Sequence, residues 1–140
     1  MLPATPKYHL PTVVKLRIKG GVVVQGCDAY LGRAGGLQGG WCDYIHTASE
    51  WANPFKKGKD GTLEEVIAKY NAYIREKIRQ DPQKWLMYLK NMVSQGRPLV
   101  LGCWCKADKK GNYQANIPCH GDVIVKLCSE AITLIQAGRL

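Results

Sequence analysis

The residues best suited to chemistry lie late in the chain, where a CxC pair precedes a cysteine–histidine pair. Cys103 and Cys105 are separated by one residue at the end of a short apolar run, and Cys119-His120 follows after a polar stretch. Residues two apart on a strand point to the same face, so we expect Cys103 and Cys105 to face together. Such a set of thiols and an imidazole suits metal binding, nucleophilic catalysis or burial in a core, and all three interpretations stay open at this point.

Zinc is the first interpretation. Three thiolates and one imidazole, from Cys103, Cys105, Cys119 and His120, are a suitable donor set for a tetrahedral structural site. The CxC pair and the adjacent Cys-His pair are less usual than two CxxC pairs, so the pattern is only moderately specific. Zinc is nevertheless the one cofactor that this pattern suggests.

A catalytic or anion-binding site at the start of a helix is the second interpretation. Backbone N–H groups at a helix N-terminus favour anions and thiolates, so Cys119 would be a nucleophile with a lowered pKa. His120 and Asp122 would then transfer a proton or orient the substrate. In the third interpretation the cysteines are small core residues, and the backbone satisfies His120.

The elements that must position these residues can be predicted from local signals. Thr62 and Glu65 form a capping box before an apolar stripe, which predicts a helix over residues 62–79. Asp81-Pro82 is a cap followed by proline at the first helical position, which predicts a second helix over residues 82–95. We expect both helices to pack against a sheet.

Short β-branched runs predict the strands of that sheet. Residues 13–18 alternate apolar and basic side chains, residues 22–25 are apolar, and the Gly-Gly turn between them suggests a hairpin or two neighbouring strands. Residues 99–104 predict a buried strand, and a last helix should begin near Cys119. The chain is therefore expected to be a small α/β or α+β domain over residues 13–140, after an irregular N-terminal arm over residues 1–12.

The motifs around the CxC and Cys-His pairs resemble the signature of a domain-of-unknown-function family found in phages, large DNA viruses and scattered cellular genomes. The resemblance rests on several motifs in the same order, which are residues 30–33 (YLGR), 51–55 (WANPF), 58–62 (GKDGT), 102–105 (GCWC) and 118–123 (PCHGDV). It implies a single small α/β domain, and it brings no established activity.

Two comparisons qualify this resemblance. The stretch between the CxC and Cys-His pairs is usually short in the family, whereas residues 106–116 add a polar, basic insertion here. The pattern also resembles a second uncharacterised small α/β family, in which the position of Cys105 is often acidic. That second resemblance favours a pocket at the strand–helix junction over an obligatory three-thiolate zinc site.

Four further residues in or next to the matched motifs are candidate ligand contacts. Arg33, beside a glycine-rich stretch, could hold a phosphate bidentately or form a surface ion pair. Trp51 could stack on a base or pack in the core, and Asn53 could bind a base edge or hold its own turn. Lys56 could contact a phosphate or simply be solvated.

Composition limits the function further. The chain has 140 residues, 46% of them hydrophobic and 22% charged, with a net charge of +9. No run is long and apolar enough to span a membrane, and no signal peptide is present, so we expect an intracellular protein without a membrane partner and with reduced cysteines. A diffuse basic surface attracts nucleotides, and nucleic acid weakly and without sequence preference.

The leading expectation is therefore a small nucleotide-binding domain or nucleotide-directed enzyme. It would act on a nucleotide or another phosphorylated small molecule, by transfer or hydrolysis at a phosphorylated or N-glycosidic substrate. The alternative is a zinc-stabilised basic module that binds nucleic acid without catalysis. No Ser-His-Asp triad, paired-carboxylate pattern or P-loop is recognisable in the sequence.

Overall fold

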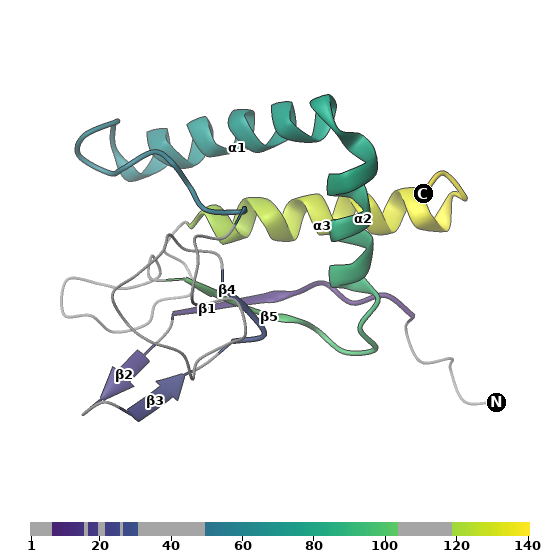
Figure 1. Cartoon of the computed structure of the whole chain (residues 1–140), viewed down its shortest axis with the longest axis horizontal. Helices are drawn as coiled ribbons and strands as arrows, with labels where there is room; N and C mark the ends of the chain where they lie inside the picture. Colours follow the sequence, from purple (N-terminus) through teal and green to yellow (C-terminus); the bar gives the residue numbers. More distant parts are fainter. Residues whose placement is uncertain (1–6, 16, 20–21, 26, 31–49, 104–118) are drawn as a thin grey trace.

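The computed structural model describes residues 7–15, 17–19, 22–25, 27–30, 50–103 and 119–140. Five strands and three helices lie within these ranges, and together they form a small α/β domain, as the sequence predicts (Figure 1). In chain order the elements are β1 (Thr12–Lys15), β2 (Arg17–Lys19), β3 (Val22–Gln25), β4 (Ala29–Tyr30), α1 (Leu63–Gln80), α2 (Pro82–Val93), β5 (Val100–Cys103) and α3 (His120–Gln136).

The main sheet has three parallel strands in the order β1-β5-β4, so β5 is central. Leu101 of β5 pairs with Val13 on one side and with Ala29 on the other. Strands β2 and β3 form a separate antiparallel pair, which confirms the predicted hairpin. The single strand predicted over residues 13–18 is wrong, because its first part joins the main sheet as β1 and its last part joins the hairpin as β2.

Asp28, the residue before β4, is hydrogen-bonded to β5. Its backbone N–H donates to the Val100 carbonyl over 2.7 Å, and its carboxylate accepts from the Val100 N–H over 2.8 Å. Arg97 donates to both carboxylate oxygens, over 2.7 and 2.9 Å. The Arg97 guanidinium, followed by the Val100 N–H, holds the pKa of Asp28 below its usual value.

The first two helices begin where their capping signals lie. Thr62 Oγ1 accepts from the Glu65 N–H, and the Glu65 carboxylate accepts from the Thr62 N–H, so the predicted capping box is present. Asp81 caps α2 through the Lys84 N–H, with Pro82 at the first helical position. Within the described ranges no helix is both long and apolar enough to cross a membrane.

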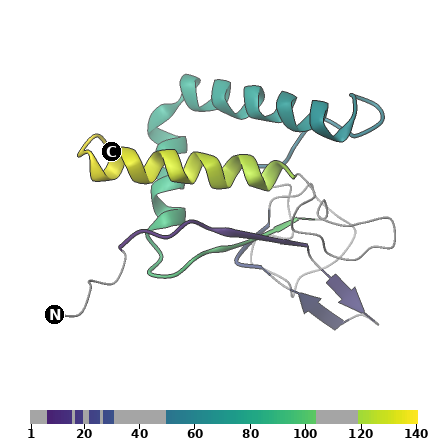
Figure 2. The same ribbon diagram turned by 180° about the vertical axis from the view of Figure 1, so that it is seen from behind.

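The helices form two layers above the main sheet. Helix α3 lies between α1 and the sheet in both views, and α2 packs against α1 and α3 (Figures 1 and 2). The expectation that α1 packs directly on the sheet is therefore wrong. The physical reason is that α3 is apolar on a broad face, with Val123, Ile124, Leu127, Cys128 and Ala131 buried, so it can cover the strands and still contact α1.

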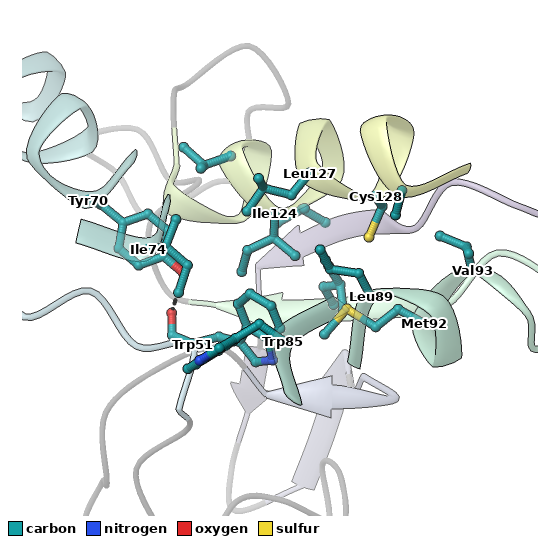
Figure 3. Close-up of a cluster of buried hydrophobic side chains, with 14 of the residues drawn as sticks. Trp51, Tyr70, Ile74, Trp85, Leu89, Met92, Val93, Ile124, Leu127 and Cys128 are labelled. Carbon is teal, nitrogen blue, oxygen red and sulfur yellow. Dashed lines mark hydrogen bonds between the residues drawn. The ribbon is translucent and has the colours of Figure 1, made fainter. Parts of the chain in front are cut away.

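One contiguous core joins the sheet to the helices. It contains Val13 and Leu101 from the strands, and a cluster from the helices that Figure 3 shows at close range, including Ile74, Trp85, Leu89 and Ile124. Val123, Leu127 and Ala131 of α3 belong to this core, whereas Leu134 is only half-buried. Within the predicted N-terminal arm, the described residues 7–11 have neither helix nor strand, whereas Thr12 already belongs to β1.

Candidate functional site at the start of helix α3

The first turn of α3 carries the three residues predicted to be catalytic. Cys119 is the N-cap, and its Sγ accepts a hydrogen bond from the Gly121 N–H over 3.3 Å. Asp122 Oδ2 accepts from the Cys119 N–H over 3.0 Å. The sulfur and the carboxylate thus satisfy N–H groups that no carbonyl of the helix can reach, which explains why the helix begins here. The Cys119 side chain is fully buried, whereas Asp122 is exposed.

His120 lies directly beside this thiol. Its Nδ1 is 3.8 Å from Cys119 Sγ, and its side chain is 5% exposed. The imidazole ring packs edge to face on the ring of Tyr70, with the two centres 5.1 Å apart. A thiol and an imidazole this close can share a proton, which is the arrangement that activates a cysteine nucleophile. The predicted Cys119–His120 pair is therefore a real contact.

Cys119, His120 and Asp122 form what we call the Cys119 corner. Tyr70, from α1, connects this corner to the segment that precedes α1. Its side chain has no exposed surface, and its hydroxyl donates to the Trp51 carbonyl over 2.7 Å, as the dashed line in Figure 3 shows. Burial, with smaller contributions from Tyr73 and Cys119, raises the pKa of Tyr70 well above the usual tyrosine value. The hydroxyl consequently stays protonated and remains a donor at neutral pH.

Tyr70 is the residue of this corner that the sequence did not single out. Its place in an apolar helical stripe predicts a core position, and that prediction is confirmed by its complete burial. Its hydroxyl bond reaches a backbone carbonyl 19 positions away, and a backbone acceptor leaves no trace in the pattern of side chains. Through this bond the WANPF and PCHGDV motifs, at residues 51–55 and 118–123, are brought to one place.

Trp51 lies in the core. Its ring packs edge to face on Trp85 with centres 4.8 Å apart, lies 6.4 Å from the ring of Tyr88, and is 7% exposed. The packing role is therefore observed, with the two aromatic residues of α2 as neighbours. Base stacking on Trp51 stays a prediction, and it would need the ring to leave this contact.

Asn53 holds its own turn, as one of its two interpretations predicts. Its Oδ1 accepts from the Phe55 N–H over 2.9 Å, and its Nδ2 donates to the Val66 carbonyl of α1 over 3.4 Å. An asparagine that bonds the backbone two residues on is a common turn device. The second bond ties that turn to α1 one helical turn before Tyr70, so Asn53 helps to set the position of Trp51.

Lys56 is exposed and begins a compact loop before α1. Its N–H donates to the Asp60 carboxylate over 2.7 Å, and its carbonyl accepts from the Asp60 N–H over 2.8 Å. Lys69 of α1 donates to the Asp60 carbonyl over 2.6 Å. The loop is thus held together by its backbone and by Asp60. Phosphate binding by the Lys56 ammonium group stays a prediction.

The predicted zinc donors are only partly within the described ranges. Cys103 is the last residue of β5, but its side chain, like Cys105 and Arg33, lies outside what the structure describes. Sulfur and nitrogen bound to one tetrahedral zinc ion lie about 3.6 Å apart, so the 3.8 Å between Cys119 Sγ and His120 Nδ1 is compatible with joint binding. Among the described residues, however, no group of three potential ligands exists.

The position of this corner in the fold is that of many ligand sites. The first turn of α3 lies toward the end of the main sheet at which the parallel strands finish (Figure 1). In open α/β sheets, ligands bind beyond the carboxyl ends of the strands, where helix N-termini also point. A ligand site where β5 ends and α3 begins stays a prediction, because the Cys103 side chain lies outside what the structure describes.

The fold and this corner define a small α/β domain with a buried thiol–imidazole pair at the start of its last helix. Residues 14–130 match the family model described as a domain of unknown function, DUF4326. The chain therefore belongs to that family. It is 30% identical over 117 residues to the uncharacterized protein R718 of Acanthamoeba polyphaga mimivirus, an alignment that covers 84% of this chain and 78% of that protein. No solved structure matches the chain significantly.

These comparisons confirm the resemblance to a family with members in large DNA viruses. The family model spans the hairpin, α1, α2 and the part of α3 up to Glu130, which includes the Cys119–His120 corner. The description of the family names no activity.

Proposed function

We propose that this domain is a nucleotide-directed enzyme whose reactive group is the Cys119 thiol, with His120 as its proton acceptor. The observation that carries the proposal is the pair itself, with Sγ and Nδ1 separated by 3.8 Å at the N-terminus of a 17-residue helix. The first-turn N–H groups favour negative charge, and one of them, from Gly121, already donates to the sulfur. A thiolate in this position is stabilised and has its base beside it.

Charge supports a phosphorylated substrate. The net charge of +9 favours anionic ligands in general, and the helix N-terminus favours an anion at this particular place. Asp122 and Asn53 use their side-chain oxygens to accept backbone N–H groups, so in the proposal they position the corner and the preceding turn.

The proposed step is a displacement through a covalent intermediate. The Cys119 thiol gives its proton to His120, and the sulfur bonds to the electrophilic phosphorus or anomeric carbon of the substrate. The bond to the leaving group breaks, and the leaving group takes the proton from His120. Water, or a second nucleophile in a transfer reaction, then displaces the sulfur and returns a proton to His120. Because Cys119 is fully buried here, the substrate must open the corner to reach it.

The test compares two buried cysteines of the same helix. Wild-type protein is incubated with a panel of nucleosides and nucleoside 5′-monophosphates, and products are followed by liquid chromatography. We expect Cys119→Ser to lower the rate by about a hundredfold or more, because serine is a far weaker nucleophile at neutral pH. Its unfolding free energy should stay close to that of wild type, since serine is a good N-cap and keeps the acceptor for the Gly121 N–H.

Cys128→Ser is the matched control. Cys128 is also fully buried on α3, and burial raises the pKa of its thiol to about 12, so it stays an uncharged core group. The change should cost about 1–3 kcal/mol of stability by burying a hydroxyl, while the rate is kept. Equal stability losses in the two variants, with no product from wild type, would contradict the proposal and favour a core role. Stoichiometric zinc by elemental analysis of the same preparation would favour the zinc-stabilised alternative.

A further inference from the structure

A strip of lysine and aromatic side chains runs along α1, away from the Cys119 corner. Lys69 Nζ lies 5.9 Å from the centre of the Phe55 ring, and Lys77 Nζ lies 5.0 Å from the centre of the Tyr73 ring. The Phe55 and Tyr73 rings meet edge to face with centres 6.1 Å apart. Lys69, Tyr73 and Lys77 follow one another at intervals of four residues, so they share one face of the helix.

The strip continues onto the start of α2. Lys84 Nζ lies 5.3 Å from the ring of Trp85 and 5.9 Å from the ring of Tyr88, and it donates to Glu50 over 2.8 Å. A groove of about 350 Å³ opens between the two helices and the WANPF segment. Its walls include Glu50, Asn53, Pro54, Tyr73, Lys77 and Lys84.

The three lysines of this strip have few direct ion-pair partners among the described residues. Among the described residues no carboxylate lies within ion-pairing distance of Lys77, and Lys69 donates to a backbone carbonyl, that of Asp60. Lys84 is paired with Glu50, but both side chains are exposed, and such pairs contribute little and exchange readily for a stronger anion. Glu65 and Asp81 also lie near enough to Lys69 and Lys84 to interact with them. Among the described residues, however, Glu50 alone forms an ion pair with the strip, so its ammonium groups can still attract an anionic ligand.

We propose that this strip binds single-stranded nucleic acid, with phosphates on Lys69, Lys77 and Lys84 and bases stacked on Phe55 and Tyr73. Basic grooves with interleaved aromatic rings are the usual means of holding single strands without sequence preference. The Phe55 and Tyr73 rings are half-buried, so each is held in place and still presents surface.

The length of the strip favours a polymer over a mononucleotide. Lys69 and Lys77 are eight residues apart, about 12 Å along a helix axis, and Lys84 of α2 lines the same groove as Lys77. A duplex would meet the lysines but would hide its bases from the rings. The inference stands independently of the proposed chemistry at Cys119, because it concerns binding alone.

The experiment measures fluorescence anisotropy of a labelled oligothymidylate of about 15 nucleotides, at several salt concentrations. We expect Lys77→Gln to weaken binding about fivefold near 0.1 M salt and to lower the salt slope by about 0.7, the effect of one phosphate contact on a single strand. Tyr73→Leu should weaken binding about fivefold or more, the effect of losing one stacked base. Should Tyr73→Leu fail to fold by circular dichroism, Phe55→Leu replaces it.

Two matched controls remove similar groups elsewhere. Lys126→Gln removes an exposed charge from α3, and Tyr8→Leu removes a ring that lies 5.6 Å from Lys7 in the same kind of contact. Both should change the affinity less than twofold. The proposal is overturned if Lys126→Gln weakens binding as much as Lys77→Gln, if a duplex of equal length binds as tightly, or if thymidine monophosphate competes equally well.

The same assay separates this proposal from the proposed chemistry. Cys119→Ser protein should bind the oligothymidylate as tightly as wild type, because Cys119 is buried in the core and is not part of the strip. If Cys119→Ser loses turnover but still binds the strand, the result bears only on the proposed chemistry. If the wild type turns over its substrate but does not bind the strand, only the proposal for the strip is contradicted.

Discussion

Replacing Tyr70 by phenylalanine tests the hydrogen bond that joins α1 to the segment containing Trp51. The substitution removes one oxygen and keeps the ring, so the edge-to-face contact with His120 at 5.1 Å is retained. What is lost is the hydroxyl that donates to the Trp51 carbonyl over 2.7 Å. Tyr70→Phe therefore isolates a single hydrogen bond in the middle of the core.

The expected cost is about 1–2 kcal/mol of unfolding free energy. A typical intramolecular hydrogen bond contributes about 0.5–1.5 kcal/mol net, and a buried carbonyl that loses a donor adds part of its desolvation cost. Tyr70 has no exposed surface, so water cannot replace the hydroxyl without entering the core. For a chain of this length the melting temperature should fall by about 3–8 °C.

A dependence on alkaline pH distinguishes this bond from general packing. Burial raises the folded-state pKa of Tyr70 above that of an unfolded tyrosine, which is about 10. The protonated hydroxyl therefore stabilises the fold fully below pH 10, and this contribution falls by about 1.4 kcal/mol per pH unit as the pH rises above that value. Wild type should lose more stability than Tyr70→Phe over the same alkaline range.

Urea unfolding at 25 °C, followed by circular dichroism and tryptophan fluorescence, measures both effects. Tyr73→Phe is the control, since Tyr73 is half-buried on the same helix and its hydroxyl has no hydrogen-bond partner among the described residues. We expect the control to stay within about 0.5 kcal/mol of wild type at neutral pH. Equal unfolding free energies for Tyr70→Phe and wild type, or identical alkaline profiles, would refute the reasoning.

Two further predictions concern the scaffold. Asp28→Asn should cost about 1–2 kcal/mol at neutral pH, because it weakens charge-assisted bonds to the backbone and to Arg97. Since the pKa of Asp28 is lowered in the fold, this contribution is present above about pH 4 and is lost as the pH falls, so the acid unfolding curve of wild type should be steeper than that of the variant. Thr62→Ala should cost about 1 kcal/mol by urea unfolding, whereas Thr62→Ser should restore most of it, and an unchanged stability for the alanine variant would contradict the role of the cap.

The helices could be predicted from the sequence because their signals are local. Thr62 and Glu65 each accept a hydrogen bond from the other's backbone N–H, within four residues. Asp81 caps the next helix by accepting from the Lys84 N–H, three residues along the chain. The Asn53 turn belongs to the same group, since its oxygen reaches only two residues along the chain. Signals of this kind are independent of the partner against which an element packs.

The layer order and the split of residues 13–18 could not be predicted in this way. Alternation of apolar residues specifies a strand but not the sheet it joins, and β1 and β2 join different sheets. Likewise an apolar stripe specifies a buried helical face but not its partner. The stripe of α1, which includes Tyr70 and Ile74, meets α2 and α3 in the fold, and α3 covers the strands.

The corner itself was predictable as a set of residue types but not as a set of contacts. The Cys119 and His120 side chains are neighbours in sequence, so their proximity follows from the chain. Tyr70 enters from 50 positions upstream, and its two contacts are a ring edge and a backbone carbonyl. Such partners carry no distinctive residue type. The packing of α1 on α3 creates the contact with His120, and the path of the segment before α1 creates the one with Trp51.

Capping alone does not account for the residue types at the start of α3. Serine, threonine, aspartate and asparagine are the strong N-caps, and cysteine is not among them, although a thiol suits a position with no exposed surface. Burial therefore explains the choice of sulfur at Cys119. Burial alone does not require an imidazole at His120, which is 5% exposed, because an apolar side chain could fill the same space. The proposed chemistry consequently rests on the pair, and His120→Leu should keep the fold while it removes the base on which the Cys119 thiolate depends.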